Sequence, residues 1–304
     1  MIFRFAQISD THNSNLTAYA NALLDDIPYL DFKCHTGDIV QNYFEQGISN
    51  AGFDSHLVVL GNHDMLLQSG VNPIQYDWTK QPTQAQAYNL FFNPYKAQTG
   101  ITIPNNTSWW FKDFDDKAVR VIGLNCHVLG DAKTTQATWL EATLSEVIVK
   151  NYKVVILSHI APDLTKSVLS TFTDLYEPEH DSVREAHSFI QESRTIIDDY
   201  ISNGGNIICG LYGHEHCDLF LNNSGVPEFV IGSTVINNYN NVQRTNNTTS
   251  SVVVNLYEYD DFLQTLKVWR LGAGDLKNGR FRKLLTWSYN KKEIISYVGL
   301  PNKK

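Results

Sequence analysis

The sequence has no long hydrophobic run. Its apolar stretches are short, such as residues 154–157, and none approaches the ~20 apolar residues that a membrane-spanning helix needs. The signal-peptide pattern, a basic segment followed by an apolar one, is also missing near Met1. We therefore expect no membrane partner, and we expect the protein to work in the cytoplasm.

Cysteine is scarce, and no two cysteines form a CxxC pair. The four cysteines of the chain are Cys34, Cys126, Cys209 and Cys217. Three of them lie in apolar, strand-like segments, which is typical of buried, reduced thiols in a cytosolic protein. The lack of a thiolate cluster also argues against a structural zinc site.

Positive charge is in short supply. The 304 residues include 24 Lys and Arg against 32 Asp and Glu, which gives a net charge of −8. A protein whose main task is to hold a nucleic acid backbone needs a basic face, so nucleic acid is not the expected partner. The hydrophobic fraction of 42% and the charged fraction of 18% are typical of a folded globular chain.

The first two-thirds of the chain alternates strand-like and helix-like segments. Short apolar runs predict strands at 3–8, 32–36, 57–60, 119–125, 154–157 and 207–211. Apolar residues at helical spacing predict helices in the front part of 15–28 and over 134–150 and 183–201. This alternation predicts an α/β fold in which helices cover a sheet.

After residue 216 the pattern changes to strands without helices between them. The strand-like runs are 229–231, 252–259, 265–269 and 284–289, and we expect them to form antiparallel sheet. We expect a single domain over 1–304, with a catalytic core at 1–236 and an extension of antiparallel strands at 237–304. Two stretches are expected to be irregular, namely the aromatic-rich 68–112 and the Asn- and Thr-rich 237–251.

Five short polar motifs each follow an apolar, strand-like run. In chain order they are Asp10-Thr11-His12, Gly37-Asp38, Gly61-Asn62-His63-Asp64, Ser158-His159 and Gly213-His214-Glu215-His216. In an open α/β sheet, ligands bind beyond the carboxyl ends of the strands. We therefore expect these motifs, although far apart in sequence, to meet at one site.

The residue types in the motifs suit divalent metals. Carboxylate, imidazole and amide oxygen are ligands for manganese, iron, zinc or cobalt. Two such ions ~4 Å apart form a clamp for in-line displacement at phosphorus. Seven candidate ligands are too many for one tetrahedral ion and enough for two ions bridged by a carboxylate: Asp10, His12, Asp38, Asn62, His159, His214 and His216.

The motif order D-x-H, GD, GNHD, H, GHxH resembles the calcineurin-like metallophosphoesterase superfamily. The residues at 121–125, Gln136, 139–141 and Leu144, together with 159–162, are similar to its cyclic-nucleotide and glycerophosphodiester phosphodiesterases. The resemblance implies an α/β fold, or α+β in the wider sense, built as a two-sheet β-sandwich flanked by helices. It also implies a metal-dependent phosphoric ester hydrolase, with diesters favoured over monoesters.

The resemblance further implies two divalent ions (Mn²⁺, Fe²⁺/Fe³⁺ or Zn²⁺) and a role for each residue. One ion would bind Asp10, His12, Asp38 and His216, and the other Asp38, Asn62, His159 and His214. A hydroxide between the metals would attack phosphorus, and His63 would stabilise the phosphoryl oxygens or protonate the leaving group. Asp64 would hold the ring of His63, and Asn62 would also lie near the phosphate.

Gln41 and His12 distinguish this chain from related subclasses of the superfamily. The superfamily often has Asp where this chain has Gln41, and purple acid phosphatases have Tyr there and lack the histidine that stands here as His12. The ferric–tyrosinate chemistry of that subclass is therefore not expected. Gln41 is expected to hold ligands less well than Asp without abolishing the site.

Several residues allow more than one interpretation. Asp64 can cap a helix N-terminus, His127 can reach the edge of the site or be structural, and Cys217 can lie near the metals or in the core. Trp109 and Trp110 can line a pocket or pack in the core. The histidines without a motif around them are treated as background: His35, His56, His180 and His187.

Two other functions compete with hydrolysis of a small-molecule phosphoester. A nuclease of the double-strand-break repair type has similar GNHD and GHEH motifs, but the net charge of −8 and the Gln-x-x-Trp-Leu segment argue against it. A metal-binding scaffold with little activity, as in vacuolar sorting proteins, tends to lack the histidine that is present here as His63. Substrate choice is expected to come from 68–112, 163–182 and 237–250.

Overall fold

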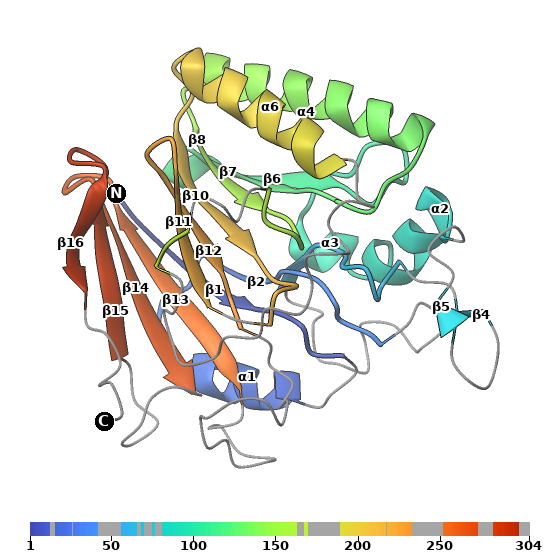
Figure 1. The fold of residues 1–304 in the computed structure, drawn as a ribbon, viewed down its shortest axis with the longest axis horizontal. Coiled ribbons are helices and arrows are strands. Elements are labelled where there is room, and N and C mark those ends of the chain that lie inside the picture. Colours follow the sequence, from blue (N-terminus) through green and yellow to red (C-terminus); the bar gives the residue numbers. More distant parts are fainter. Residues whose placement is uncertain are drawn as a thin grey trace.

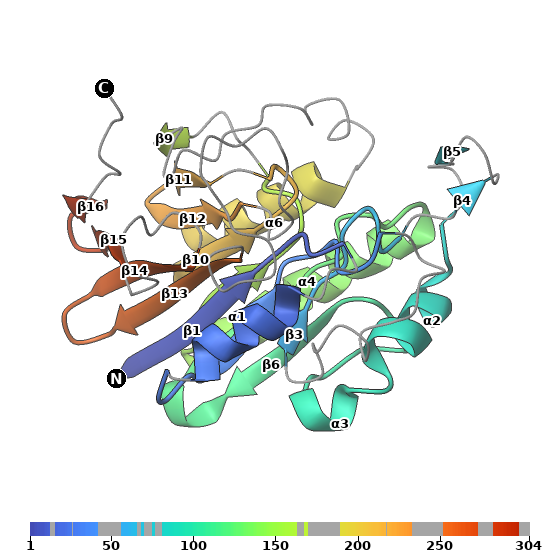
Figure 2. The same ribbon diagram turned by 90° about the horizontal axis from the view of Figure 1, so that it is seen from below.

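The computed structural model consists of two mixed β-sheets that face each other, with helices on their outer sides (Figures 1 and 2). It describes residues 1–12, 16–25, 27–41, 56–65, 68–69, 75–76, 81–162, 167–169, 189–216, 218–232, 252–272 and 282–297.

The first sheet joins the two ends of the chain. Its strand order is β16-β15-β14-β13-β1-β2-β3. The parallel part consists of β1 (Ile2–Ile8), β2 (Phe32–His35) and β3 (His56–Val58). The antiparallel part consists of β13 (Val253–Asp260), β14 (Thr265–Gly272), β15 (Arg282–Ser288) and β16 (Glu293–Tyr297). Because β13 pairs antiparallel with β1, from Ile2↔Asp260 to Gln7↔Asn255, the C-terminal strands continue the sheet that carries the first motifs.

The second sheet has the order β6-β7-β8-β10-β12-β11-β9. Its central strands are parallel: β7 (Val119–Gly123), β8 (Lys153–Leu157), β10 (Ile207–Tyr212) and β12 (Val226–Val230). Antiparallel strands flank them: β6 (Trp110–Phe114), β11 (Leu219–Asn223) and β9 (Ser167–Leu169). A separate small ladder pairs β4 (Gln68–Ser69) with β5 (Gln75–Tyr76).

Helices cover the outer sides of the sheets. The helices α4 (Asp131–Lys150) and α6 (Phe189–Ser202) lie side by side over the second sheet, and α1 (Leu16–Asp25) lies along the first (Figures 1 and 2). Leu140, Leu144 and Val147 of α4 pack with Ile156 of β8 and Ile197 of α6 in one apolar cluster. None of the helices among these described ranges is long and apolar enough to cross a membrane.

Aromatic side chains fill the space between the two sheets. Tyr257 of the first sheet lies edge-on to Phe229 of the second, with ring centroids 5.2 Å apart. Trp287 and Phe220 make a second contact across the layers at 5.6 Å. All four residues are at most 1% exposed. Burial of such large rings ties the sheets together by the hydrophobic effect.

The predicted fold class is confirmed: two mixed sheets, flanking helices and additional antiparallel strands at the C-terminus. The predicted strands and helices up to residue 211 all exist, with ends shifted by a few residues. For α6, the predicted beginning at 183 lies outside the described residues, as does the loop 237–251. The division into a core at 1–236 and an extension at 237–304 stays a prediction.

The prediction that 68–112 is irregular is wrong over its second half. The structure has α2 (Gln84–Ala87), the π-helical turn η2 (Tyr88–Phe92) and α3 (Lys96–Thr99) there. A capping box begins α2, since the side chains of Thr83 and Gln86 each accept the other's backbone N–H. Trp109 and Trp110 are 1% and 0% exposed, which decides for core packing.

Another correction concerns the strands after residue 216. The run 229–231 was expected in an antiparallel sheet, but β12 pairs parallel with β10 and antiparallel only with β11. Two strands, β11 and β16, have no counterpart in the prediction. β11 ends on two asparagines, and β16 is largely exposed, so neither has the apolar pattern on which the prediction depended.

Candidate metal centre

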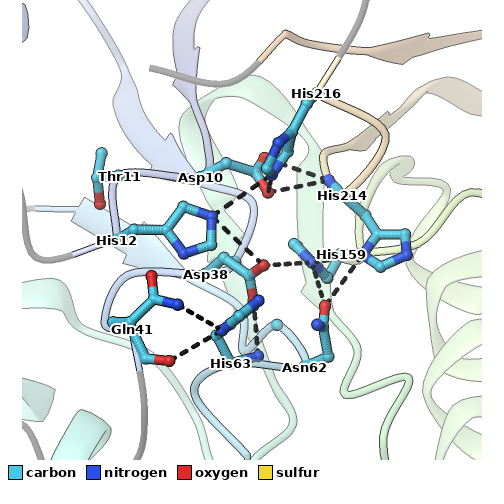
Figure 3. Close-up of polar contacts among 12 residues, drawn as sticks. Asp10, Thr11, His12, Asp38, Gln41, Asn62, His63, His159, His214 and His216 are labelled. Carbon is cyan, nitrogen blue, oxygen red and sulfur yellow. Dashed lines mark hydrogen bonds and ion pairs between the residues drawn. The ribbon is translucent and has the colours of Figure 1, made fainter. Parts of the chain in front are cut away.

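All five motifs lie where a strand of one of the two sheets ends. The motif of Asp10 follows β1, that of Asp38 follows β2, and that of Asn62 follows β3. His159 follows β8 and His214 follows β10, so both sheets contribute (Figure 3). The strands concerned are parallel within each sheet, which brings the motifs to one edge of the sandwich, as the sequence predicts.

Glycines allow these loops to approach one another closely. A Cβ on Gly37 would collide with the ring of His159, and Gly37 has a φ of +100° that side chains rarely tolerate. A Cβ on Gly61 would collide with the carboxylate of Asp38. These two glycines therefore each make room for a candidate ligand from another motif.

Five of the seven candidate ligands have backbone in the left-handed region. The φ angles are 53° for Asp10, 45° for His12, 54° for Asp38, 71° for His214 and 51° for His216. Non-glycine residues adopt this conformation rarely, and it costs on the order of 1–3 kcal/mol each. Such strain at the ends of regular strands is typical of functional sites.

Four candidate ligands form what we call the rim cluster: Asp10, His12, Asp38 and His216. One ligand atom from each lies within 4.8 Å of the others. His216 Nε2 lies 3.3 Å from Asp10 Oδ1 and 3.4 Å from His12 Nε2. The side chains of His12 and His216 are 10% and 15% exposed, so this cluster borders on solvent.

The inner cluster consists of Asp38, His159 and His214, to which we add Asn62. Ligand atoms of the first three also lie within 4.8 Å of one another, and all three are buried. Asn62 Oδ1 lies 3.0 Å from both His159 Nε2 and His214 Nδ1. Asp38 belongs to both clusters, as expected of a carboxylate that bridges two ions.

The comparison with protein families identifies the chain. The model of the calcineurin-like phosphoesterase family matches residues 3–218, which is more than two-thirds of the sequence. The chain belongs to the calcineurin-like phosphoesterase family. Members use divalent metals, and this family member has candidate ligand clusters for them. Its likeness to the cyclic-nucleotide and glycerophosphodiester branch stays a prediction.

Solved structures match this chain at low sequence identity. A dimetal phosphatase from Danio rerio matches with a TM-score of 0.52 at 12% identity, covering 94% of this chain and 99% of the other. GAP50, the anchor in the inner membrane complex of Plasmodium, gives 0.49 at 12% identity, covering 100% and 90%. YfcE, a phosphoesterase from E. coli, gives 0.34 at 12%, covering 98% and 100%. A search of curated protein sequences found no significant match.

Electrostatics keeps both carboxylates of this phosphoesterase site ionised. Burial by itself would raise the pKa of Asp10, but the hydrogen bond and charge of His216 outweigh it and lower that pKa. For Asp38, burial is likewise outweighed by the charges of His159 and His63, and its pKa is held well below 3.8. Two buried anions ringed by imidazoles are a donor set that fits divalent cations.

The hydrogen bonds of His159 orient it as a ligand. Its Nδ1 lies 2.7 Å from the carbonyl oxygen of Thr36, which can only accept, so Nδ1 carries the proton of the neutral ring. Nε2 then presents its lone pair toward Asp38 and Asn62. This is the usual arrangement of a metal-binding histidine. Without a cation, burial lowers the pKa of His159, but Asp38 more than compensates and raises it to about 9.

The contact between His63 and Asp64 was predicted wrongly. The Asp64 carboxylate instead accepts the backbone N–H groups of Val40 at 2.9 Å and Gly61 at 2.8 Å. It thus pins two motif loops together, while burial and the charge of Asp38 raise its pKa to about 8. His63 Nδ1 is 2.8 Å from the carbonyl oxygen of Gln41, which takes the part expected of Asp64.

His35 is a residue of the site that the sequence analysis treated as background. The N–H of Gly37 donates to its Nδ1 at 3.2 Å, and its Nε2 then donates to Thr11 Oγ1 at 3.1 Å. It joins the first motif to the second. Its place two residues before Gly37 is the signal that could have revealed it.

The structure describes some of the remaining candidate and background residues and leaves others outside the described ranges. His127 is buried with its ring 6.0 Å from that of His159, outside both clusters. His56 is buried on β3 and lines a small space with Phe91 and Phe92. Cys217, His180 and His187 lie outside the described residues, as does most of 163–182.

Proposed function

We propose that the protein is a hydrolase of phosphoric esters that uses two divalent ions and favours a small phosphodiester. The observation that carries the proposal is that two groups of ligand atoms share one carboxylate, Asp38, at the edge where five strands end. Family membership supports the reaction class. The net charge of −8 disfavours nucleic acid as the substrate.

The chain's own part in this chemistry is to hold the ions in place. Asp10, His12 and His216 would hold one, and Asn62, His159 and His214 the other, with Asp38 between them. When bound, two divalent cations neutralise charge on phosphate oxygens and lower the pKa of water. The closely packed imidazoles and ionised carboxylates are prearranged for this purpose, since the left-handed backbone already aims them.

His63 would handle the proton of the leaving group. Its Nδ1 donates to the Gln41 carbonyl, so the neutral ring keeps its basic nitrogen at Nε2. Its backbone N–H donates to Asp38 Oδ1 at 2.9 Å, which fixes the residue beside the shared carboxylate. From the half-buried rim, a protonated Nε2 can donate to the ester oxygen as it leaves, a step that typically contributes ~10²–10⁴-fold.

The preference for a diester depends on the resemblance alone. The Gln136 side chain, part of that resemblance, accepts the backbone N–H of Asn125 at 2.9 Å and donates to its carbonyl oxygen at 2.8 Å. It thereby fixes α4 to the end of β7, which is a structural task. A substrate panel must therefore decide the point.

The test combines metal loading with such a panel. Protein reconstituted with Mn²⁺ should bind two ions per chain and hydrolyse bis-p-nitrophenyl phosphate faster than p-nitrophenyl phosphate. Cyclic nucleotides, glycerophosphodiesters and nucleotide sugars then identify the class. Cleavage of DNA at a comparable rate would favour the nuclease instead, and two bound ions without any turnover would favour the scaffold.

The first prediction concerns His63→Ala. We expect kcat to fall about a hundredfold because the proton donor is lost, while two ions per chain remain bound because His63 belongs to neither cluster. Steady-state kinetics and metal analysis of the same preparation check both halves. Full turnover in this variant would refute the role of His63.

A further inference from the structure

A chain of buried hydrogen bonds crosses from one sheet to the other next to the candidate metal centre. Arg270 of β14 forms an ion pair with Asp218, which directly precedes β11 of the second sheet. The Nε of Arg270 donates to Asn255 Oδ1 at 2.9 Å. Asn255 Nδ2 donates to the hydroxyl of Tyr257 at 3.1 Å, and that hydroxyl donates to Gln7 Oε1 at 2.6 Å. Each of these five residues is at most 1% exposed.

At the Gln7 end, this chain of hydrogen bonds fixes the ends of two strands whose following residues are candidate metal ligands. Gln7 Nε2 donates to the carbonyl oxygen of Tyr212 at 2.8 Å and to Thr36 Oγ1 at 3.1 Å. Tyr212 stands directly before Gly213 and His214. Thr36 stands directly before Gly37 and Asp38, and its carbonyl oxygen accepts the hydrogen bond from His159. One amide group therefore fixes β10 relative to β2.

At the Asp218 end, the chain of hydrogen bonds fixes the loop that carries His216. Asp218 comes two residues after His216 and also accepts the N–H of Gly232, which follows β12, at 2.9 Å. The ion pair with Arg270 thus connects this loop to the first sheet. Buried polar groups are costly when they lack partners, so an interlocked chain of this kind favours one register over all others.

Three members of the chain come from strands outside the family match at 3–218. Asn255 and Tyr257 lie on β13 and Arg270 on β14, and Asn255 is the pairing partner of both Gln7 and Arg270. The antiparallel strands therefore do more than extend a sheet edge. They place polar side chains beside the end of β1, just before the candidate ligand Asp10.

We propose that Tyr257, together with Asn255 and Arg270, is a positioning residue. It holds the loops that carry the inner-cluster and rim-cluster ligands at a fixed spacing. Tyr257 touches no ligand. It acts through Gln7 on the strand ends at Tyr212 and Thr36, and so on His214, Asp38 and His159. Its expected effect on metal binding depends on the proposed function, whereas its effect on the loops does not.

The test compares two tyrosines of the same strand. Tyr257→Phe removes the hydroxyl from the middle of the hydrogen-bond chain, and Tyr259→Phe removes a hydroxyl that donates to Asp261, just after the last residue of β13. Both side chains are at most 2% exposed and both substitutions keep the ring, so each variant loses a buried hydroxyl and retains its apolar packing. We expect Mn²⁺ affinity to fall about tenfold in Tyr257→Phe, the lower end of the range for groups that hold ligands, and to change less than about twofold in Tyr259→Phe.

A second readout needs neither metal nor turnover. In metal-free protein, Tyr257→Phe should speed amide hydrogen exchange in peptides over 8–12, 36–38 and 213–216, and Tyr259→Phe should not. Equal exchange in both variants, or equal loss of affinity, would overturn the positioning role even if both fold. If the wild type binds no pair of ions, the proposed function fails while the exchange comparison still decides this inference.

Discussion

Two groups of charged side chains among the described residues are built differently: the group around Arg120 and the candidate metal centre. Around Arg120, whose side chain is fully buried, every charge has a partner: its Nε and Nη2 donate to Asp113 at 2.6 and 2.7 Å, and its Nη1 to Glu146 at 2.9 Å. In the candidate metal centre, two carboxylates lie among imidazoles on strained backbone. The first group is complete in itself, whereas the second is the one that we propose to be completed by divalent cations.

The difference teaches which buried charges serve stability and which serve function. The Arg120 group joins β6, β7 and α4 with ordinary strand and helix geometry, and its guanidinium also stacks on Phe111 at 3.9 Å. The metal centre costs backbone strain and close contacts that a stable fold alone would not need. Mutations in the two groups should therefore have opposite signatures.

The largest effect is expected for Asp38→Asn. Because Asp38 is the one carboxylate in both clusters, we expect kcat to fall at least about a thousandfold and the bound metal to drop below two ions per chain. Steady-state kinetics and metal analysis measure the two effects, and circular dichroism checks folding. Retention of both ions would show that Asp38 does not bridge them.

Arg120→Gln should show the opposite signature. Loss of the buried guanidinium removes three hydrogen bonds and leaves Lys150 as the cation that pairs with both Asp113 and Glu146. We expect the free energy of unfolding to fall by about 2 kcal/mol. Two ions should stay bound, because the group lies away from the clusters. Urea unfolding gives the first quantity and metal analysis the second. Loss of metal in a folded variant would break the comparison.

The two clusters of the metal centre should also differ from each other. We expect His159→Gln to weaken Mn²⁺ binding about a hundredfold and His216→Gln about tenfold, because a ligand shut off from water has no water ready to replace it. His159 is fully buried and tied to Thr36, whereas the His216 side chain is 15% exposed. Calorimetric titration of both variants decides. The reverse order would mean that burial does not set the contribution of a ligand.

The sequence was sufficient for most of the fold and for the meeting of the five motifs at one edge, whereas their role as metal ligands stays a prediction. Apolar runs mark strands such as β8 and β10 because a parallel sheet covered on both faces buries every residue. The polar motifs stand out because each interrupts such a run at its end. Each motif is a short run of neighbouring residues directly after a strand, so it can be recognised from the sequence alone.

What the sequence could not show is local in space only. The partner of the His63 ring is a main-chain oxygen, that of Gln41, and any residue type could supply it. The link from Tyr257 to Gln7 joins residues 250 positions apart, and no spacing rule connects them. Short helices such as α2 also escape, since four residues have no period to recognise.

The smallest predicted effect is a pH dependence that belongs to the Arg120 group. Burial acts to raise the pKa of Asp113, but its hydrogen bonds to Arg120 and Lys150 outweigh that and hold it below 3.8 in the folded state. A carboxyl group with a depressed folded pKa stabilises the fold above its unfolded pKa and loses this contribution as the pH falls through the folded one. Urea unfolding should therefore find Asp113→Asn less stable than the wild type at pH 6, with a gap that narrows below about pH 3.8. A gap that stays constant down to pH 3 would mean that the charge of Asp113 contributes nothing, and that the Arg120 group holds by its hydrogen bonds and packing alone.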